Sequence, residues 1–316
     1  MAQQTRPSMM AWRVHEYGSP DVMRFDRIPR PEPGPGDVLV KVEAAGVGPW
    51  DGWIRAGKSA LPQPLPLTLG SDLAGEVVAV GPGVSRPRVG EQVYGVTNSQ
   101  FVGAYAEYAL ASAAMISSKP TSLNYAEAAS VPVIAVTARQ ALFDQAQLKA
   151  GQTVLIHGAA GNVGAYAVQL ASRAGLRILA TAAKDDAAFL RDLGAHEAID
   201  YRTSFEDSVR DMDAVIDLVG GDTKRRSFQV LRRGGKLISA VSEPDQDLAQ
   251  RHGVEAAFFL VEVTTQQLDE IARLIDDGLR VRVGAVLPLA DAREAHLMLE
   301  GVRPRPKGKI VLSVGA

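Results

Sequence analysis

The fold is decided by one stretch, Thr153-Val-Leu-Ile-His157, followed at once by Gly158-Ala-Ala-Gly161-Asn-Val-Gly164 and Ala165-Tyr-Ala-Val-Gln-Leu-Ala-Ser-Arg173. Strand-favouring residues lead into a turn of small residues, and a segment of helical periodicity opens directly from it. Free N–H groups at such a helix start attract anions. Gly161 lets the backbone approach a diphosphate, and Gly164 lets the helix pack closely on the strand. The stretch predicts a dinucleotide site, although its two alanines depart from the GxGxxG form.

Short apolar runs continue to alternate with helical segments after this turn. Such alternation is typical of βαβ units, and hence of a parallel sheet that is covered on both faces. The region therefore reads as a doubly wound α/β nucleotide fold. Its later strands are expected at 177–181, 198–201, 213–219 and 235–241.

Length and charge favour a two-domain protein with a small-molecule partner. The chain has 316 residues, of which 46% are hydrophobic, and a domain averages about 150 residues. Its 34 basic and 36 acidic side chains leave no electrostatic footprint for nucleic acid or an anionic membrane. The basic cluster 303–309 is small, and we interpret it as a flexible loop rather than a nucleic-acid contact.

The chain has no cysteine, which excludes disulfides, thiolate nucleophiles and cysteine-ligated zinc and leaves the redox compartment open. The first ten residues lack the apolar core of a secretion signal, and no run approaches the ~20 apolar residues that span a bilayer. We therefore expect a cytoplasmic protein without a membrane partner.

The residues before the nucleotide fold have a different pattern. Alternating or compact strand signals are separated by proline-rich turns, which predicts a β-rich domain with long loops. Helical patterns begin near Asn124 with a break at Pro132, and the domain boundary is placed there. The chain ends in a predicted helix, 291–299, and a strand, 309–313, and periodicity alone does not assign this tail to either domain.

Five motifs then occur in one order. Four of them are Gly46-Val-Gly-Pro-Trp-Asp51, Gly70-Ser-Asp-Leu-Ala-Gly75, Val80-Gly-Pro-Gly-Val84 and Val89-Gly-Glu-Gln-Val93, and the fifth is the glycine turn. Together they closely resemble the medium-chain dehydrogenase/reductase superfamily, in its zinc-independent quinone oxidoreductase (zeta-crystallin-like) branch. The resemblance extends over nearly the whole chain, 11–314.

The resemblance implies a GroES-like β-rich catalytic domain plus a Rossmann domain with a doubly wound parallel sheet. The catalytic domain would comprise 1–127 and be completed by 288–316, and the Rossmann dinucleotide-binding domain would comprise 128–287. It also implies a homodimer, and an active site in the interdomain cleft beyond the carboxyl ends of the strands.

Departures from the zinc-dependent relatives are informative. Those relatives place cysteine where Gly48 stands and His-Glu where Ser71-Asp72 stand, and they carry a four-cysteine lobe for which 96–102 is too short. Neither zinc site is therefore expected. Without a Lewis acid, hydride transfer to a conjugated acceptor needs less help than alcohol oxidation. The sequence thus favours reduction of quinones or α,β-unsaturated carbonyls.

The cofactor is inferred from the second strand of the nucleotide fold. An NAD site usually has a carboxylate about 20 residues after the first glycine, but 178–182 contains none, which permits NADPH. Relatives that use NADPH have a basic residue and a tyrosine nearby, so we assign Thr181, Lys184 and Tyr201 to the 2′-phosphate. Asp185 follows directly, so a merely solvated Lys184, and NADH as cofactor, are the alternatives.

Position within the family pattern supplies the other expected contacts. The remaining cofactor-binding residues would be Thr137, Gly158, Ala159, Gly161, Asn162, Val163, Gly164, Val219, Val241, Phe259, Val261 and Lys309. The substrate pocket would contain Gly48, Trp50, Trp53, Asp72 and Asn98. Core or dimer packing is the alternative for both tryptophans, and core packing is the alternative for Val219, Val241 and Val261. Zinc-independent relatives often have asparagine at the position of Gly48, so any hydrogen bond from that amide is in doubt.

No residue identifies itself as a general acid. Asp72, Tyr94, Asn98 and Tyr105 are conceivable donors, but each is more readily structural, and solvent can supply the proton. The five histidines lack metal-ligand spacing, and His157 is expected to pack beneath the turn. Three functions follow: an NADPH-dependent reductase of quinones or enones without metal or flavin, a non-catalytic NADPH-binding structural or redox-sensing protein, and an enoyl-thioester reductase.

Overall fold

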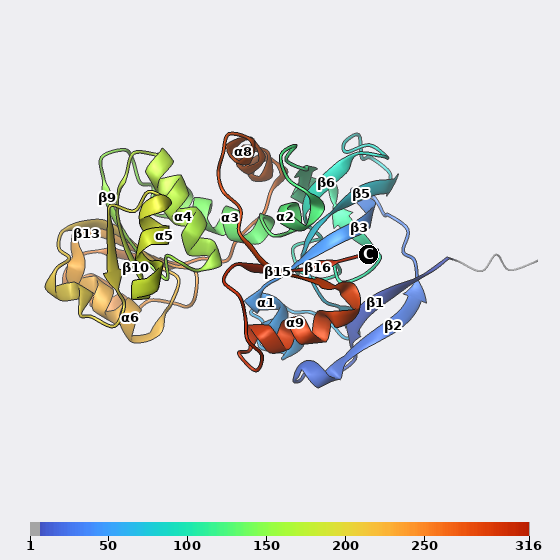
Figure 1. Cartoon of the computed structure of the whole chain (residues 1–316), viewed down its shortest axis with the longest axis horizontal. Helices are drawn as coiled ribbons and strands as arrows, with labels where there is room; N and C mark the ends of the chain where they lie inside the picture. Colours follow the sequence, from blue (N-terminus) through green and yellow to red (C-terminus); the bar gives the residue numbers. More distant parts are fainter. Residues whose placement is uncertain (1–6, 316) are drawn as a thin grey trace, which may run out of the picture. The chain divides into compact units, whose positions relative to one another are not determined.

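The chain divides into two units, each with its own sheet, in a computed structural model that describes residues 7–315 (Figure 1). Unit 1 comprises the chain up to Val133 and again from Glu262 onward, and unit 2 is Ile134–Val261. A β-rich unit and a parallel-sheet unit confirm the predicted fold class. Among the described residues, no helix combines the length and apolar character that a bilayer span requires.

Unit 2 is a doubly wound parallel sheet with the order β11-β10-β9-β12-β13-β14. The order runs outward in both directions from β9 and β12, so the topological switch lies between these two strands. Their bounds are β9 Thr153–His157, β10 Arg177–Ala182, β11 Glu197–Asp200, β12 Met212–Asp217, β13 Leu231–Ser239 and β14 Glu255–Phe258. The helices are α4 Asn162–Arg173, α5 Ala187–Asp192, α6 Gly221–Arg226 and α7 Gln246–His252.

Unit 1 contains a seven-stranded sheet, β15-β16-β3-β5-β6-β8 with β7 on β3, and a three-stranded sheet, β2-β1-β4. The C-terminal strand β16, Lys309–Ser313, pairs antiparallel with β3, Asp37–Val47, so the tail joins this unit. The other strands are β1 Ser8–Val14, β2 Met23–Pro29, β4 Leu67–Thr68, β5 Asp72–Val80, β6 Gln92–Val96, β7 Tyr108–Ser112, β8 Ile116–Ser118 and β15 Val283–Pro288.

The helices of unit 1 include α1, Pro49–Arg55, and α9, Ala292–Leu299, which contact each other. Helix α2, Tyr125–Ala129, is capped by Asn124, whose side chain accepts from the N–H of Glu127. Pro132 begins α3, Pro132–Arg139, which belongs to unit 2 from Ile134 onward and continues as a π-helix over Gln140–Gln145. The predicted helical break at Pro132 is therefore confirmed.

The boundaries between the two units fall after Val133 and before Glu262, and not at the expected 127/128 and 287/288. The second boundary differs because α8, Thr265–Asp276, packs on unit 1. Tyr94 Oη donates to the carbonyl of Leu268 over 2.6 Å, and Thr265 Oγ1 donates to the carbonyl of Ile116 over 2.9 Å. Ser122 Oγ donates to Asp276 over 2.7 Å. These bonds place 262–287 with the β-rich unit.

Candidate functional site

The turn between β9 and α4 contains two glycines whose replacement causes strain. Gly158 has φ +68°, and a Cβ on Gly164 would lie 2.3 Å from the carbonyl oxygen of Gly158. The predicted close packing at Gly164 is therefore confirmed. Gly161 is the N-cap of α4 and provides no side-chain cap, which leaves first-turn N–H groups for an anion or water.

Two side chains that the sequence analysis missed organise the loops after β12 and β13. Asp217 is fully buried and accepts from the N–H of Gly220 over 2.8 Å and from Ser239 Oγ over 2.7 Å. Lys224 Nζ donates to the carbonyl and hydroxyl oxygens of Ser242, each over 2.7 Å. The available signal was Asp217 itself, a charged residue inside the apolar run 213–219.

These loops hold two of the predicted cofactor residues at the surface. Val219 is 53% exposed and Val241 is 39% exposed, so the core-packing alternative does not apply to them. Phe259 and Thr137 are buried, while Val261 is half-buried. Their contact with a cofactor stays a prediction.

His157 is buried in unit 2 and hydrogen-bonded to Thr181. The two ring nitrogens of His157 lie 2.9 Å from Thr181 Oγ1 and 3.0 Å from Ser227 Oγ. Burial lowers the pKa of His157 to about 4, so the ring is neutral at pH 7. Thr181 is 2% exposed with its hydroxyl facing this histidine, and its contact with the 2′-phosphate stays a prediction.

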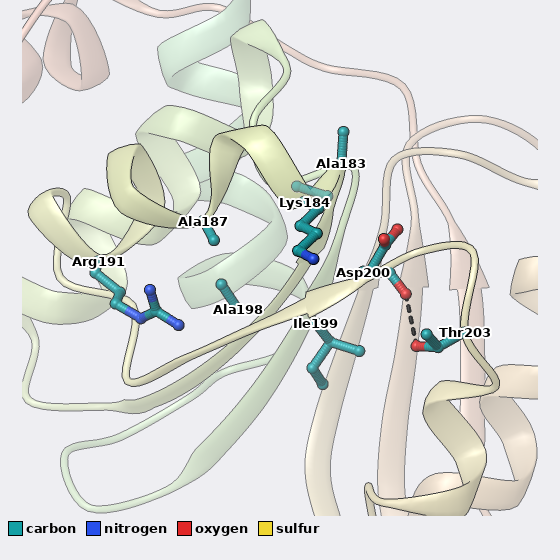
Figure 2. A pocket seen from close by; sticks show the side chains of 9 residues that line it. Ala183, Lys184, Ala187, Arg191, Ala198, Ile199, Asp200 and Thr203 are labelled. Atoms are coloured by element: carbon teal, nitrogen blue, oxygen red, sulfur yellow. Dashed lines mark hydrogen bonds between the residues drawn. The ribbon is translucent and has the colours of Figure 1, made fainter.

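A cavity of about 500 Å³ opens beside the end of β10, between α5 and β11 (Figure 2). Its lining residues are Ala182, Ala183, Lys184, Ala187, Arg191, Ala198, Ile199, Asp200 and Thr203. Lys184 and Arg191 both extend toward the strand side of this cavity in Figure 2. Arg191 was missed by the sequence analysis, although its spacing of seven from Lys184 indicates one side of a helix.

Tyr201 follows β11 directly and is 56% exposed, with the Arg202 guanidinium 5.4 Å from its ring centroid. Asp200 also lines the cavity, and one of its carboxylate oxygens accepts from the N–H of Arg202. The structure thus brings Lys184 and Arg191 to one cavity and leaves Tyr201 exposed at the end of the adjoining strand.

A second cluster lies in unit 1 around Trp50. Its indole Nε1 donates to Ser71 Oγ over 2.9 Å, and Lys309 Nζ lies 4.2 Å from the ring centroid. Lys309 also contacts Asp72 Oδ2 over 2.9 Å, and these two charged side chains are 1% and 0% exposed. The structure therefore groups Lys309, which the sequence assigns to the cofactor, with residues assigned to the substrate pocket.

Asp51 joins this cluster through the backbone of Gly48. Its Oδ2 accepts from the Gly48 N–H over 2.8 Å and from Tyr105 Oη over 2.9 Å. Asp51, Gly48 and Tyr105 are all buried. Burial raises the pKa of Asp51 to about 7 and raises the pKa of Asp72, where Lys309 opposes it. Nothing in the motif marked Asp51 as a buried acid.

Other predicted residues lie outside this cluster. Asn98 accepts from the N–H of Gln100 and donates to the carbonyl of Val102 over 2.8 Å, so it closes its own loop. Trp53 is 52% exposed. Tyr94 is bound to α8, which occupies its hydroxyl proton.

Asp51 is expected to make unit 1 less stable as the pH rises. With a folded-state pKa of about 7 against 3.8, the folded state retains the proton longer. The stability that it contributes is full below pH ~4 and is lost by pH ~7, a change of about 4 kcal/mol. Denaturant unfolding followed by tryptophan fluorescence at pH 4–8 measures this, since all three tryptophans belong to unit 1. The Asp51→Asn variant should lose the slope, and an unchanged slope would assign it to another group.

Comparisons with known proteins agree with one another over most of the chain. The family described as "Alcohol dehydrogenase GroES-like domain" matches residues 34–121, and "Zinc-binding dehydrogenase" matches 193–312. The quinone oxidoreductase of Homo sapiens is 32% identical, over 91% of this chain and 93% of that protein. The structure of the quinone oxidoreductase from Coxiella burnetii has a TM-score of 0.90 at 33% identity, covering 98% of this chain and 100% of that one. A mycobacterial protein complexed with NADPH has a TM-score of 0.85 at 33% identity, covering 97% and 100%.

The zinc in the second family description does not fit the residues present. Within 7–315, no group of three or more His, Cys, Asp or Glu side chains is arranged to hold a metal ion. Gly48 offers no ligand, Ser71 accepts from the indole of Trp50, and Asp72 is paired with Lys309. No chemical step is therefore derived through zinc.

Proposed function

The chain belongs to the medium-chain dehydrogenase/reductase superfamily, in its quinone oxidoreductase (zeta-crystallin-like) branch, and from this premise we propose that it reduces quinones or α,β-unsaturated carbonyls with NADPH and without zinc. The relatives support an oxidoreductase with a nicotinamide cofactor. The observation that carries the finer proposal is the glycine turn of unit 2, together with a unit 1 cluster in which, within residues 7–315, no group of metal ligands is found.

The residues of unit 2 fit a dinucleotide. Uncapped N–H groups at the start of α4 bind the diphosphate, and the backbones after β12 and β13 are fixed by Asp217 and Lys224. Lys184 and Tyr201 contact the 2′-phosphate, and Arg191 adds a second cation. When bound, NADPH supplies the hydride. The residues of unit 1 contact the acceptor, and solvent supplies the proton.

One assay separates the candidate functions. Loss of NADPH absorbance is followed with a quinone, an acyclic enone and an enoyl thioester as acceptors. Turnover of the quinone or the enone supports the proposal. NADPH binding without turnover of any acceptor identifies a structural or redox-sensing protein, and turnover of the thioester alone identifies an enoyl reductase. We also propose a homodimer, which the resemblance supports and light scattering on the purified protein tests.

Arg191 and Lys184 are expected to select NADPH over NADH. The Arg191→Ala and Lys184→Ala variants should each weaken NADPH binding by roughly tenfold, because a charge-assisted bond to the 2′-phosphate is lost. Binding of NADH, which lacks that phosphate, should be unaffected. The readout is kcat/KM for each cofactor, with 2′,5′-ADP and 5′-AMP binding as a check without turnover.

Arg177→Gln is the matched control for this test, since Arg177 is exposed and begins β10 at the end far from the cavity. It removes the same charge and should change the affinity for neither cofactor. Equal losses for NADPH and NADH in Arg191→Ala would show that Arg191 supports the fold or the diphosphate instead of the 2′-phosphate.

A further inference from the structure

Gly48 and Trp50 compete for one volume in unit 1. A Cβ built on Gly48 would lie 2.3 to 2.5 Å from three carbons of the Trp50 ring. The backbone of Gly48 has φ −129° and ψ 163°, which any residue adopts. Glycine is therefore required at this position by the neighbouring indole and not by the chain conformation.

The indole is fixed where it lies. Its N–H is bound to Ser71 Oγ over 2.9 Å, and the Lys309 ammonium lies 4.2 Å from the ring centroid. Lys309 is held in turn by Asp72, with both side chains buried. A larger residue at position 48 must displace this ring and break these contacts. Trp50 itself is half-buried.

Position 48 and Ser71 both contact the indole. The family resemblance matches these two positions to zinc ligands of the zinc-dependent relatives. This chain thus has an apolar aromatic wall there, and the only polar hydrogen of the indole is already donated to Ser71. Such a surface offers area and ring contact but no hydrogen bond to an acceptor.

We propose that Trp50 is the residue that determines acceptor specificity, that its indole selects flat quinone rings over acyclic enones, and that Gly48 is required to make room for it. This proposal rests on the proposed function and names the acceptor class within it. Aromatic contact favours a fused-ring quinone, whereas a short acyclic enone has little surface to place against the ring.

The kinetic test compares two acceptors. In Trp50→Ala, KM for a naphthoquinone should rise about tenfold with kcat little changed, while KM for a short acyclic enone changes less than about twofold. Trp50→Phe keeps a ring and should recover part of the loss. Equal losses on both acceptors, or none on the quinone, would overturn the proposal.

Calorimetric titration of naphthoquinone without NADPH covers the case in which no acceptor is turned over. The proposed function then fails, but the role of Trp50 is still decided by binding. An approximately tenfold weaker affinity in Trp50→Ala supports it, and an unchanged affinity overturns it.

The coupling of positions 48 and 50 is tested by stability alone. Gly48→Asn should lower the thermal unfolding midpoint by roughly 5 °C, because the amide displaces the indole. In a Trp50→Ala background the same substitution should cost little, since the space is free. Trp53→Ala is the matched comparison, because it removes an exposed indole from the same helix. The loss of thermal stability in Trp53→Ala should add to that in Gly48→Asn. If the losses in Trp50→Ala and Gly48→Asn are also additive, the steric argument is wrong.

Discussion

Replacing Lys309 with methionine is expected to lower the free energy of unfolding of unit 1 by about 3–5 kcal/mol, because it leaves Asp72 charged and buried without its partner. Methionine keeps the apolar stem of lysine, so packing changes little. Asp72 still accepts the N–H of Val133, which does not replace an ammonium 2.9 Å away.

Denaturant unfolding followed by tryptophan fluorescence measures this loss, since Trp12, Trp50 and Trp53 all lie in unit 1. The double variant Asp72→Asn with Lys309→Met should recover most of the stability, because no buried charge is then unpaired. Arg305→Met removes an exposed cation from the same tail and should be nearly neutral. If the single and double variants lose the same stability, the pair is not what stabilises this core.

The nucleotide fold was predictable because its signals are local. Most strands of unit 2 contain a short apolar run, and the helices between the strands indicate that the strands are parallel. The location of α8 was not predictable, since an amphipathic helix carries no information about which sheet it covers. It packs on β6 and β8 of unit 1 through bonds between Tyr94 and the Leu268 carbonyl and between Thr265 and the Ile116 carbonyl, at residues more than a hundred positions apart.

The candidate site shows the same division. The glycine turn could be found, because backbone strain restricts which residues fit. The burial of Thr181 could not, because it depends on the register that sets Thr181 opposite His157 on the next strand. The alternation of a strand predicts which residues share a face, but only the register with the neighbouring strand decides which residue each one lies beside. Lys309 and Asp72 are separated by 237 positions, and only the folded sheet brings them together.

Gly164→Ala is expected to weaken NADPH binding by roughly 100-fold, the larger effect predicted for unit 2. The new Cβ would lie 2.3 Å from the carbonyl oxygen of Gly158 and 2.6 Å from the Cα of Ala159. Both are backbone atoms, so relief requires a shift of the turn away from the start of α4. That shift moves the N–H groups that bind the diphosphate, and overpacking of this kind costs about 1–3 kcal/mol.

A graded series tests this without depending on one variant. In Gly161→Ala the Cβ would lie 3.1 Å from the Gly158 oxygen, so a smaller adjustment and roughly tenfold weaker binding are expected. Gly52→Ala, which meets nothing within 4 Å in unit 1, should leave binding unchanged. Calorimetry with NADPH measures all three, and circular dichroism checks that the helices persist. If a folded Gly164→Ala variant binds NADPH with unaltered affinity, the diphosphate binds elsewhere, because a shift of this turn then has no effect on binding.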